Sequence, residues 1–147
     1  MTYKIIEELN HNLEQSCYTG DVEASKYYID QGADMFNLPL LHACEGGHTE
    51  CAKLCLSSGA ININSSMATC GTKGYLNCAK ICHDYGAIDI DWCFINACRY
   101  GHLHIMKWCV EIGISIKGIQ RGFNNAYDSA QMECSMFCLD HGAQQYL

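Results

Sequence analysis

This chain of 147 residues carries twelve cysteines, whose thiols could bind a metal or take part in redox chemistry. Three pairs of cysteines are spaced i, i+4, and this spacing places both thiols of a pair on one face of a helix. The pairs are Cys51/Cys55, Cys78/Cys82 and Cys134/Cys138. Two such pairs facing each other would supply four thiolates, the ligand set of many structural zinc sites.

The sequence repeats with a period of about 27 residues, described below. Residues at the positions equivalent to these cysteines in other repeats argue against a metal. The same positions hold Ala24, Tyr28 and Ile105 in other parts of the chain, and none of these side chains replaces a thiolate ligand. Cysteine also serves as a small buried apolar residue, and that is our interpretation here. We therefore expect no metal and no other cofactor, with a metal-binding or redox-responsive module as the alternative. Cys93 lies outside these positions and is expected to be the most exposed thiol.

The histidines give a weaker pattern, and no catalytic arrangement stands out. His48 and His102 each follow a glycine, as at a turn between helices, where a structural role is expected. His102 and His104 are two residues apart, a spacing that does not put both rings on one helical face. The sequence holds no nucleophile elbow, phosphate-binding loop, zinc-peptidase motif or calcium loop. We predict no catalytic residue and no enzymatic activity.

Charge and composition narrow the class of partner. The formal net charge is −7, with Lys and Arg outnumbered by Asp and Glu, which argues against DNA or RNA as a partner. Half of the residues are apolar, enough for a core, but no uninterrupted apolar run is long enough to span a membrane. The first residues show no signal-peptide pattern. We expect an intracellular, cytoplasmic protein without membrane contact.

Two columns of residues recur along the chain with the same period. One column is Gly32, Gly59, Gly86, Gly113 and Gly142, and the other is Gly20, Gly47, Gly74, Gly101 and Ala130. In both columns the steps are 27, 27, 27 and 29 residues. The pattern predicts five copies of a unit made of a helix, a turn, a second helix and a short link. A helix pair with one apolar face cannot bury that face alone, so the copies must stack into a solenoid.

Other columns assign roles within each copy. Polar residues lie ten positions before each turn: Asn10, Asn37, Asn64, Asp91 and Gln120. The first four are residue types suited to a helix N-cap and are predicted to be caps. Residues three positions further on are predicted to be core: Leu13, Leu40, Met67, Phe94 and Phe123. A lysine column marks an outer face: Lys26, Lys53, Lys80 and Lys107. The prediction is a single domain over 1–147, with a cap and five repeats at 1–9, 10–36, 37–63, 64–90, 91–119 and 120–147.

Residues 39–60, PLLHACEGGHTECAKLCLSSGA, resemble an ankyrin repeat. The resemblance extends in looser form over the five copies and implies an all-α, ankyrin-like helix-turn-helix solenoid. The period of 27 residues is shorter than the 33 of the family. The missing residues fall in the links, so we expect the β-hairpin fingers of ankyrin repeats to be reduced or absent. Short, cysteine-rich copies of this kind are similar to those of large DNA viruses and some intracellular microbes, so the location would be the host cell if the protein is viral.

The resemblance also implies a function, which is binding an unidentified protein partner through the concave face of the stack. In ankyrin repeats the first helix and the two residues before the turn line that face. The candidate binding residues are Tyr18, His42, Glu45, Thr72, Lys73, Trp92, Asn96, Arg99, Tyr100 and Asp128. Tyrosine, tryptophan and arginine are enriched among residues that dominate binding energy. We expect a monomer or a weak homo-oligomer, with self-association through an end repeat as a further alternative.

Overall fold

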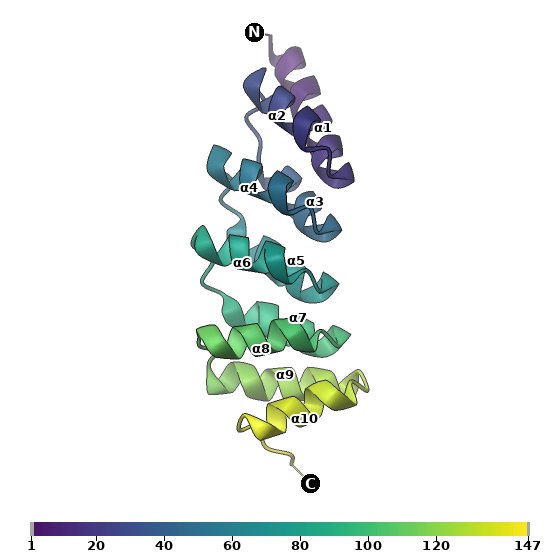
Figure 1. Cartoon of the computed structure of the whole chain (residues 1–147), viewed down its shortest axis with the longest axis vertical. Helices are drawn as coiled ribbons and strands as arrows, with labels where there is room; N and C mark the ends of the chain where they lie inside the picture. The colour runs from purple at the N-terminus through teal and green to yellow at the C-terminus, as the bar shows by residue number, and fades with distance from the viewer. Residues whose placement is uncertain (1, 147) are drawn as a thin grey trace.

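The computed structural model describes residues 2–146 as a stack of ten helices, and no strand occurs in that range. The helices are α1 (Tyr3–Thr19), α2 (Val22–Asp30), α3 (Asn37–Gly46), α4 (Thr49–Ser58), α5 (Ile63–Lys73), α6 (Leu76–Asp84), α7 (Ile90–Tyr100), α8 (Leu103–Ile112), α9 (Ile116–Asp128) and α10 (Met132–Asp140). Successive pairs lie one below the other from the N-terminal to the C-terminal end of the molecule (Figure 1). The expected all-α helical solenoid is confirmed.

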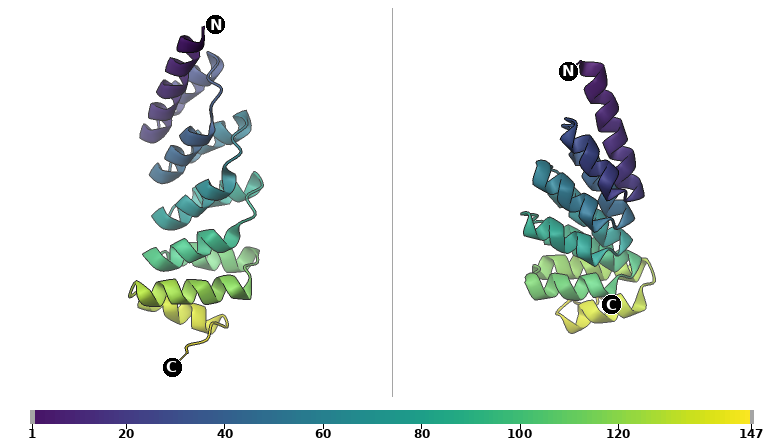
Figure 2. Two further views of the ribbon diagram at one scale, coloured as in Figure 1. Left: turned by 180° about the vertical axis from the view of Figure 1, so that it is seen from behind. Right: turned by 45° about the horizontal axis from the view of Figure 1, so that its top comes forward.

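The odd-numbered helices pack against one another in one layer, and α2, α4 and α6 pack against one another in a second. The links between pairs run along one edge of the stack (Figure 2). Each predicted core position is buried in the first-helix layer, from Leu13 to Phe123. The lysine column is exposed on the second helices, and Lys53 pairs with Glu50 there at 2.9 Å.

The turns inside each pair depend on residues with positive φ. Gly47 has φ of +73°, and its equivalents are glycines except in the fifth pair, where Ala130 takes φ of +58°. A Cβ on Gly47 would approach the ring of Tyr75 to 2.7 Å. From the second pair onward, the residue that follows the turn position therefore lies against the turn glycine of the preceding pair. We call this column of side chains the turn stack, formed by His48, Tyr75, His102 and Gln131.

The predicted N-caps are wrong in their role. Asn10 lies in the middle of α1, and Asn37 and Asn64 lie at the beginning of α3 and α5 without capping their own helices. The side-chain oxygen of Asn64 instead accepts hydrogen bonds from the backbone N–H groups of Ile88 and Asp89, at 2.8 and 3.0 Å. Those residues belong to the link that follows the next helix.

The same arrangement recurs in every pair. Asn10 accepts from the N–H groups of Asp34 and Met35, and Asn37 accepts from those of Ile61 and Asn62. The carboxylate of Asp91 and the amide oxygen of Gln120 accept from single N–H groups in later links, those of Ser115 and Gln144. We call these five residues the link clamp. Because a link without a hairpin leaves its N–H groups without strand partners, the clamp supplies the acceptors that a β-ladder would provide.

One further expectation differs from the structure. Cys93 is fully buried, because it lies on the inner side of α7, where its backbone contacts Gly71 of α5 and its thiol contacts Cys109 of α8. The cap at 1–9 stays a prediction, and residues 3–9 are the first turns of α1. Within them Ile5 is exposed, whereas Leu9 packs partly against the core.

Candidate protein-binding face

The first helices present one continuous surface, because side chains one repeat apart touch across it. His42 of α3 contacts Glu14 of α1 at 3.2 Å, and the amide of Asn96 on α7 donates to the carbonyl oxygen of Ala68 on α5 at 3.1 Å. Arg99 of α7 donates through two nitrogens to the side-chain oxygen of Asn125 on α9. We call this surface of α1, α3, α5, α7 and α9 the first-helix face.

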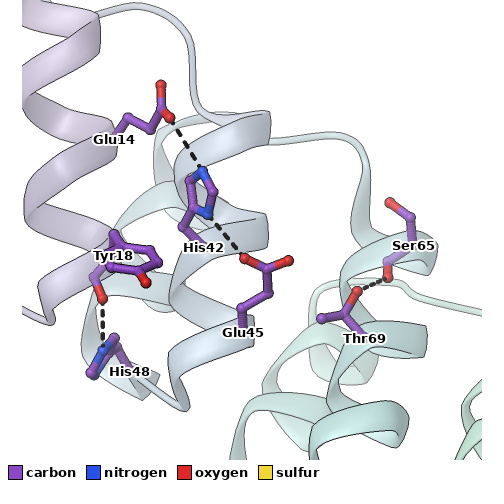
Figure 3. Close-up of polar contacts among 7 residues, drawn as sticks. All are labelled: Glu14, Tyr18, His42, Glu45, His48, Ser65 and Thr69. Carbon is purple, nitrogen blue, oxygen red and sulfur yellow. Dashed lines mark hydrogen bonds and ion pairs between the residues drawn. The ribbon is translucent and has the colours of Figure 1, made fainter.

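The N-terminal end of the first-helix face is acidic. The ring of His42 lies between the carboxylates of Glu14 and Glu45, at 3.2 and 3.0 Å (Figure 3). Both contacts are hydrogen bonds at once only when both ring nitrogens carry protons. Tyr18 meets His42 edge to face, with the ring centroids 5.6 Å apart, and 59% of Tyr18 remains exposed.

The C-terminal end combines aromatic and basic side chains. The guanidinium of Arg121 lies over the ring of Trp92, 5.4 Å from its centroid, in a cation–π contact between α9 and α7. Trp92 is 48% exposed and borders a hollow of about 310 Å³ whose other walls are Asn64, Ser65, Ala68 and Asp89. Small residues on α5 thus leave space beside the indole, and Tyr100 is also half-exposed at the end of α7.

Beside the face, the turn stack connects neighbouring repeats. The Nε2 atom of His48 donates to the carbonyl oxygen of Tyr18 at 3.1 Å, and that of His102 donates to the carbonyl oxygen of Thr72 at 3.0 Å. His104 donates in the same way to Gly74. These rings satisfy carbonyl groups at the ends of the first helices. His48 and His102 therefore have the structural role expected from the sequence.

The ten predicted binding residues differ in their surroundings. His42, Glu45, Asn96 and Arg99 hold side-chain contacts within the face, and Thr72 contributes to the turn stack through its backbone. Tyr18, Lys73, Trp92, Tyr100 and Asp128 are exposed. Asp128 borders a second hollow, of about 320 Å³, at the C-terminal end of the stack, together with Phe123, Tyr127 and Tyr146.

Glu14, Arg121 and Asn125 complete the face but were not predicted from the sequence. Each is the partner of a predicted residue one period away: Glu14 of His42, Arg121 of Trp92, and Asn125 of Arg99. The period itself was the signal that could have found them, because equivalent positions of successive first helices are neighbours. The cysteines contribute nothing to this surface, since all twelve are buried and unpaired by disulfides.

No helix in the described part of the chain is both long and apolar enough to cross a membrane. Residues 37–68 match the family model for the ankyrin repeat. Among solved structures, the ankyrin repeat domain of human ASB11 is similar to this chain with a TM-score of 0.75 and 23% sequence identity, over 90% of this chain and 69% of that one. No curated protein sequence matches the chain. The architecture of the stack is therefore that of ankyrin repeats.

Proposed function

We propose that this chain, an ankyrin-repeat protein by its fold and by the family match of residues 37–68, is a non-enzymatic scaffold that binds a partner protein along the concave side of the stack, on the first-helix face. Ankyrin repeats are generally protein–protein interaction modules. The observation that carries the proposal is Trp92, a large aromatic side chain left half-exposed beside a hollow and held in place by Arg121. A rigid, partly desolvated aromatic residue next to a hollow is a typical anchor for a partner side chain.

The charges of the face indicate the partner's chemistry. Glu14 and Glu45 make the end over α1 and α3 acidic, whereas Arg99 and Arg121 make the end over α7 and α9 basic. A segment that is basic at one end and acidic at the other complements both ends. Between them, the small residues of α5 give an apolar side chain access to Trp92.

The length of the face sets the length of that segment. Neighbouring first helices pack about 8–10 Å apart, so the five first helices together span about 40 Å. An extended peptide of about 12 residues covers that distance. An extended segment of that length, lying across the first helices, therefore fits the face.

Substitution of the exposed aromatic residues tests the proposal. Partners captured by the full chain from the native host are compared with those captured by Trp92→Ala and Tyr100→Ala chains, which should lose the partner without a change in circular dichroism. Tyr27→Ala and Tyr85→Ala are matched controls, because both residues are comparably exposed but lie on or beside the second helices. Loss of the partner in the controls, or its retention in the two test variants, would show that the face is wrongly assigned.

Charge reversal tests the orientation of the partner. Arg99→Glu and Glu45→Lys should each weaken the interaction, and charge reversal at the matching end of the partner segment should restore it. Raising the salt concentration should slow association of the unmodified chain. Binding that ignores both changes would exclude the proposed charge complementarity.

A reducing compartment is proposed as the site of action. All twelve cysteines are free thiols in the core, and such a chain is suited to the cytoplasm, where thiols stay reduced. Imaging of the tagged chain in its native host tests this location, and secretion into an oxidising compartment would contradict it.

A further inference from the structure

One set of four buried positions recurs at each boundary between neighbouring repeats. Each set takes one residue from the first helix of the earlier repeat and three from the later repeat, of which two are spaced i, i+4 on its second helix. The four sets are Cys17/Ala43/Cys51/Cys55, Cys44/Cys70/Cys78/Cys82, Gly71/Ala97/Ile105/Cys109 and Cys98/Ala126/Cys134/Cys138. Cysteine occupies all four positions only at the boundary between the second and third repeats.

At that boundary the thiols converge in the interior between α3, α5 and α6. The sulfur atoms of Cys44, Cys70 and Cys82 all lie within 4.8 Å of one another, and Cys44 and Cys82 are 3.8 Å apart. Cys78 lies one turn before Cys82 on α6 and borders this group, but its sulfur is not within 4.8 Å of all three. All four residues are buried.

The distances suit a tetrahedral metal site. Four sulfur atoms bound to Zn²⁺ at about 2.3 Å are separated from one another by about 3.8 Å. The same spacing occurs in the pairs Cys17/Cys55 and Cys98/Cys138, at 3.6 and 3.9 Å. The distance between two sulfur atoms therefore does not distinguish this boundary from the other two. The number of thiols that converge there does.

We propose that Cys44, Cys70, Cys78 and Cys82 form a four-thiolate binding site for Zn²⁺ that joins the second and third repeats. Binding forms four Zn–S bonds and releases the four thiol protons to solvent, with no change in oxidation state. The ion would connect α3 of one repeat to α5 and α6 of the next, in addition to their packing contacts.

The surroundings of the site favour thiolates. Cys78 lies in the first turn of α6, where the helix dipole stabilises negative charge, and its sulfur contacts the hydroxyl of Thr49 at 3.6 Å.

The burial of the site sets the design of the test. The full chain is unfolded with chelator and reductant, and it is then refolded with Co²⁺, whose tetrahedral thiolate complexes have a characteristic visible spectrum, or with Zn²⁺. Native mass spectrometry counts the ions. We expect one ion per chain and the spectrum of a four-thiolate site.

Cys70→Ala is the decisive variant, because it turns the set into the pattern of Cys17/Ala43/Cys51/Cys55, which the chain already accommodates in its fold. Loss of one ligand should weaken binding by at least about 100-fold, more than the loss of a hydrogen bond to a ligand. Cys98→Ala is the matched control, since it removes a thiol from a set that has only three, and it should bind as the unmodified chain does. Equal loss in both variants, or no thiolate spectrum in the unmodified chain, would overturn the proposal.

A gain-of-site variant tests the pattern itself. Ala126→Cys completes the set of Cys98, Cys134 and Cys138, and the ion count should rise from one to two per chain. A folded Ala126→Cys chain that still binds one ion would contradict the assignment of binding to the four-position set.

Discussion

At the scale of single residues, one side-chain oxygen organises each link. The amide oxygen of Asn64 holds two consecutive N–H groups, those of Ile88 and Asp89. Asn10 and Asn37 act in the same way, whereas Asp91 and Gln120 each hold one N–H group. These hydrogen bonds are exposed, so each contributes the net value of about 0.5–1.5 kcal/mol rather than the larger penalty of a buried donor without a partner.

We therefore predict that Asn64→Ala lowers the free energy of unfolding by about 1–2 kcal/mol, because two donors lose one acceptor. Urea unfolding followed by circular dichroism measures the change. Asn77→Ala is the control, since Asn77 is an exposed helical residue outside the clamp, and its substitution should be close to neutral. Equal effects of the two substitutions would show that the clamp adds little.

A second prediction concerns the buried thiols and pH. Burial raises the pKa of the Cys98 thiol above its ordinary value of 9.0. Above pH 9 the thiol ionises in the unfolded chain but stays protonated in the folded one, so the free energy of unfolding falls as pH rises toward the raised value. The slope is at most about 1.4 kcal/mol per pH unit for one thiol.

Urea unfolding at a series of pH values between about 8 and 10.5 measures this slope. Cys98→Ala should make it shallower, because the substitution removes one group that takes part in the linkage. An unchanged slope would show that the Cys98 thiol ionises as readily in the folded chain as in the unfolded one.

The sequence predicted which residues are buried better than it predicted what polar residues contact. The core column and the apolar role of most cysteines follow from periodicity, because burial repeats with the helix. Asn64 was interpreted as an N-cap because asparagine at a helix start is typical of one, but its acceptor faces N–H groups 24 and 25 residues away. Cys93 was expected to be exposed only because it matched no column of the repeat. A residue outside the columns can still point into the core, so this expectation was wrong.

At the scale of helices and turns, neighbouring repeats are coupled through the turn stack. We predict that Gly47→Ala destabilises the chain for two reasons: a left-handed conformation costs alanine about 1–2 kcal/mol, and its Cβ meets the Tyr75 ring. In a Tyr75→Ala background only the first cost remains. A double-mutant cycle measured by urea unfolding should therefore give a coupling energy of about 0.5–3 kcal/mol.

Gly59→Ala provides the matched cycle. Gly59 also has a positive φ, of +117°, but a Cβ there would meet no atom within 4 Å, so the cost of the substitution should not depend on Tyr75. The number and order of the helices followed from the 27-residue period. The sequence predicted a structural role for His48 and His102 but not for Tyr75 and Gln131, because tyrosine and glutamine share no side-chain property with histidine that would place all four in one column.

At the scale of the whole molecule, packing is uneven along the stack. Helix α7 packs much more extensively against α5 and α9 than α3 does against α5. We predict that amide hydrogen exchange is slowest in α7 and faster in α1 to α4, because local opening is easiest where few contacts must break. Exchange followed by mass spectrometry under native conditions measures this gradient, and uniform protection from end to end would contradict it.

The first-helix face could be predicted from the sequence only in part. The resemblance to ankyrin repeats, confirmed in fold, predicts that the first helices form the layer that faces a partner. The acidic and basic ends emerged only when Glu14 and Arg121 were placed beside His42 and Trp92 in space. Which residues bind a partner stays a prediction.

The link clamp has a consequence for biosynthesis. Each clamp oxygen precedes the N–H groups that it holds by 24 or 25 residues, and the histidine contacts of the turn stack join residues 30 apart. Every such partner leaves the ribosome one repeat after its acceptor has been made, so each new repeat can dock on a finished neighbour. Contacts this local allow the chain to fold one repeat at a time as it is synthesised.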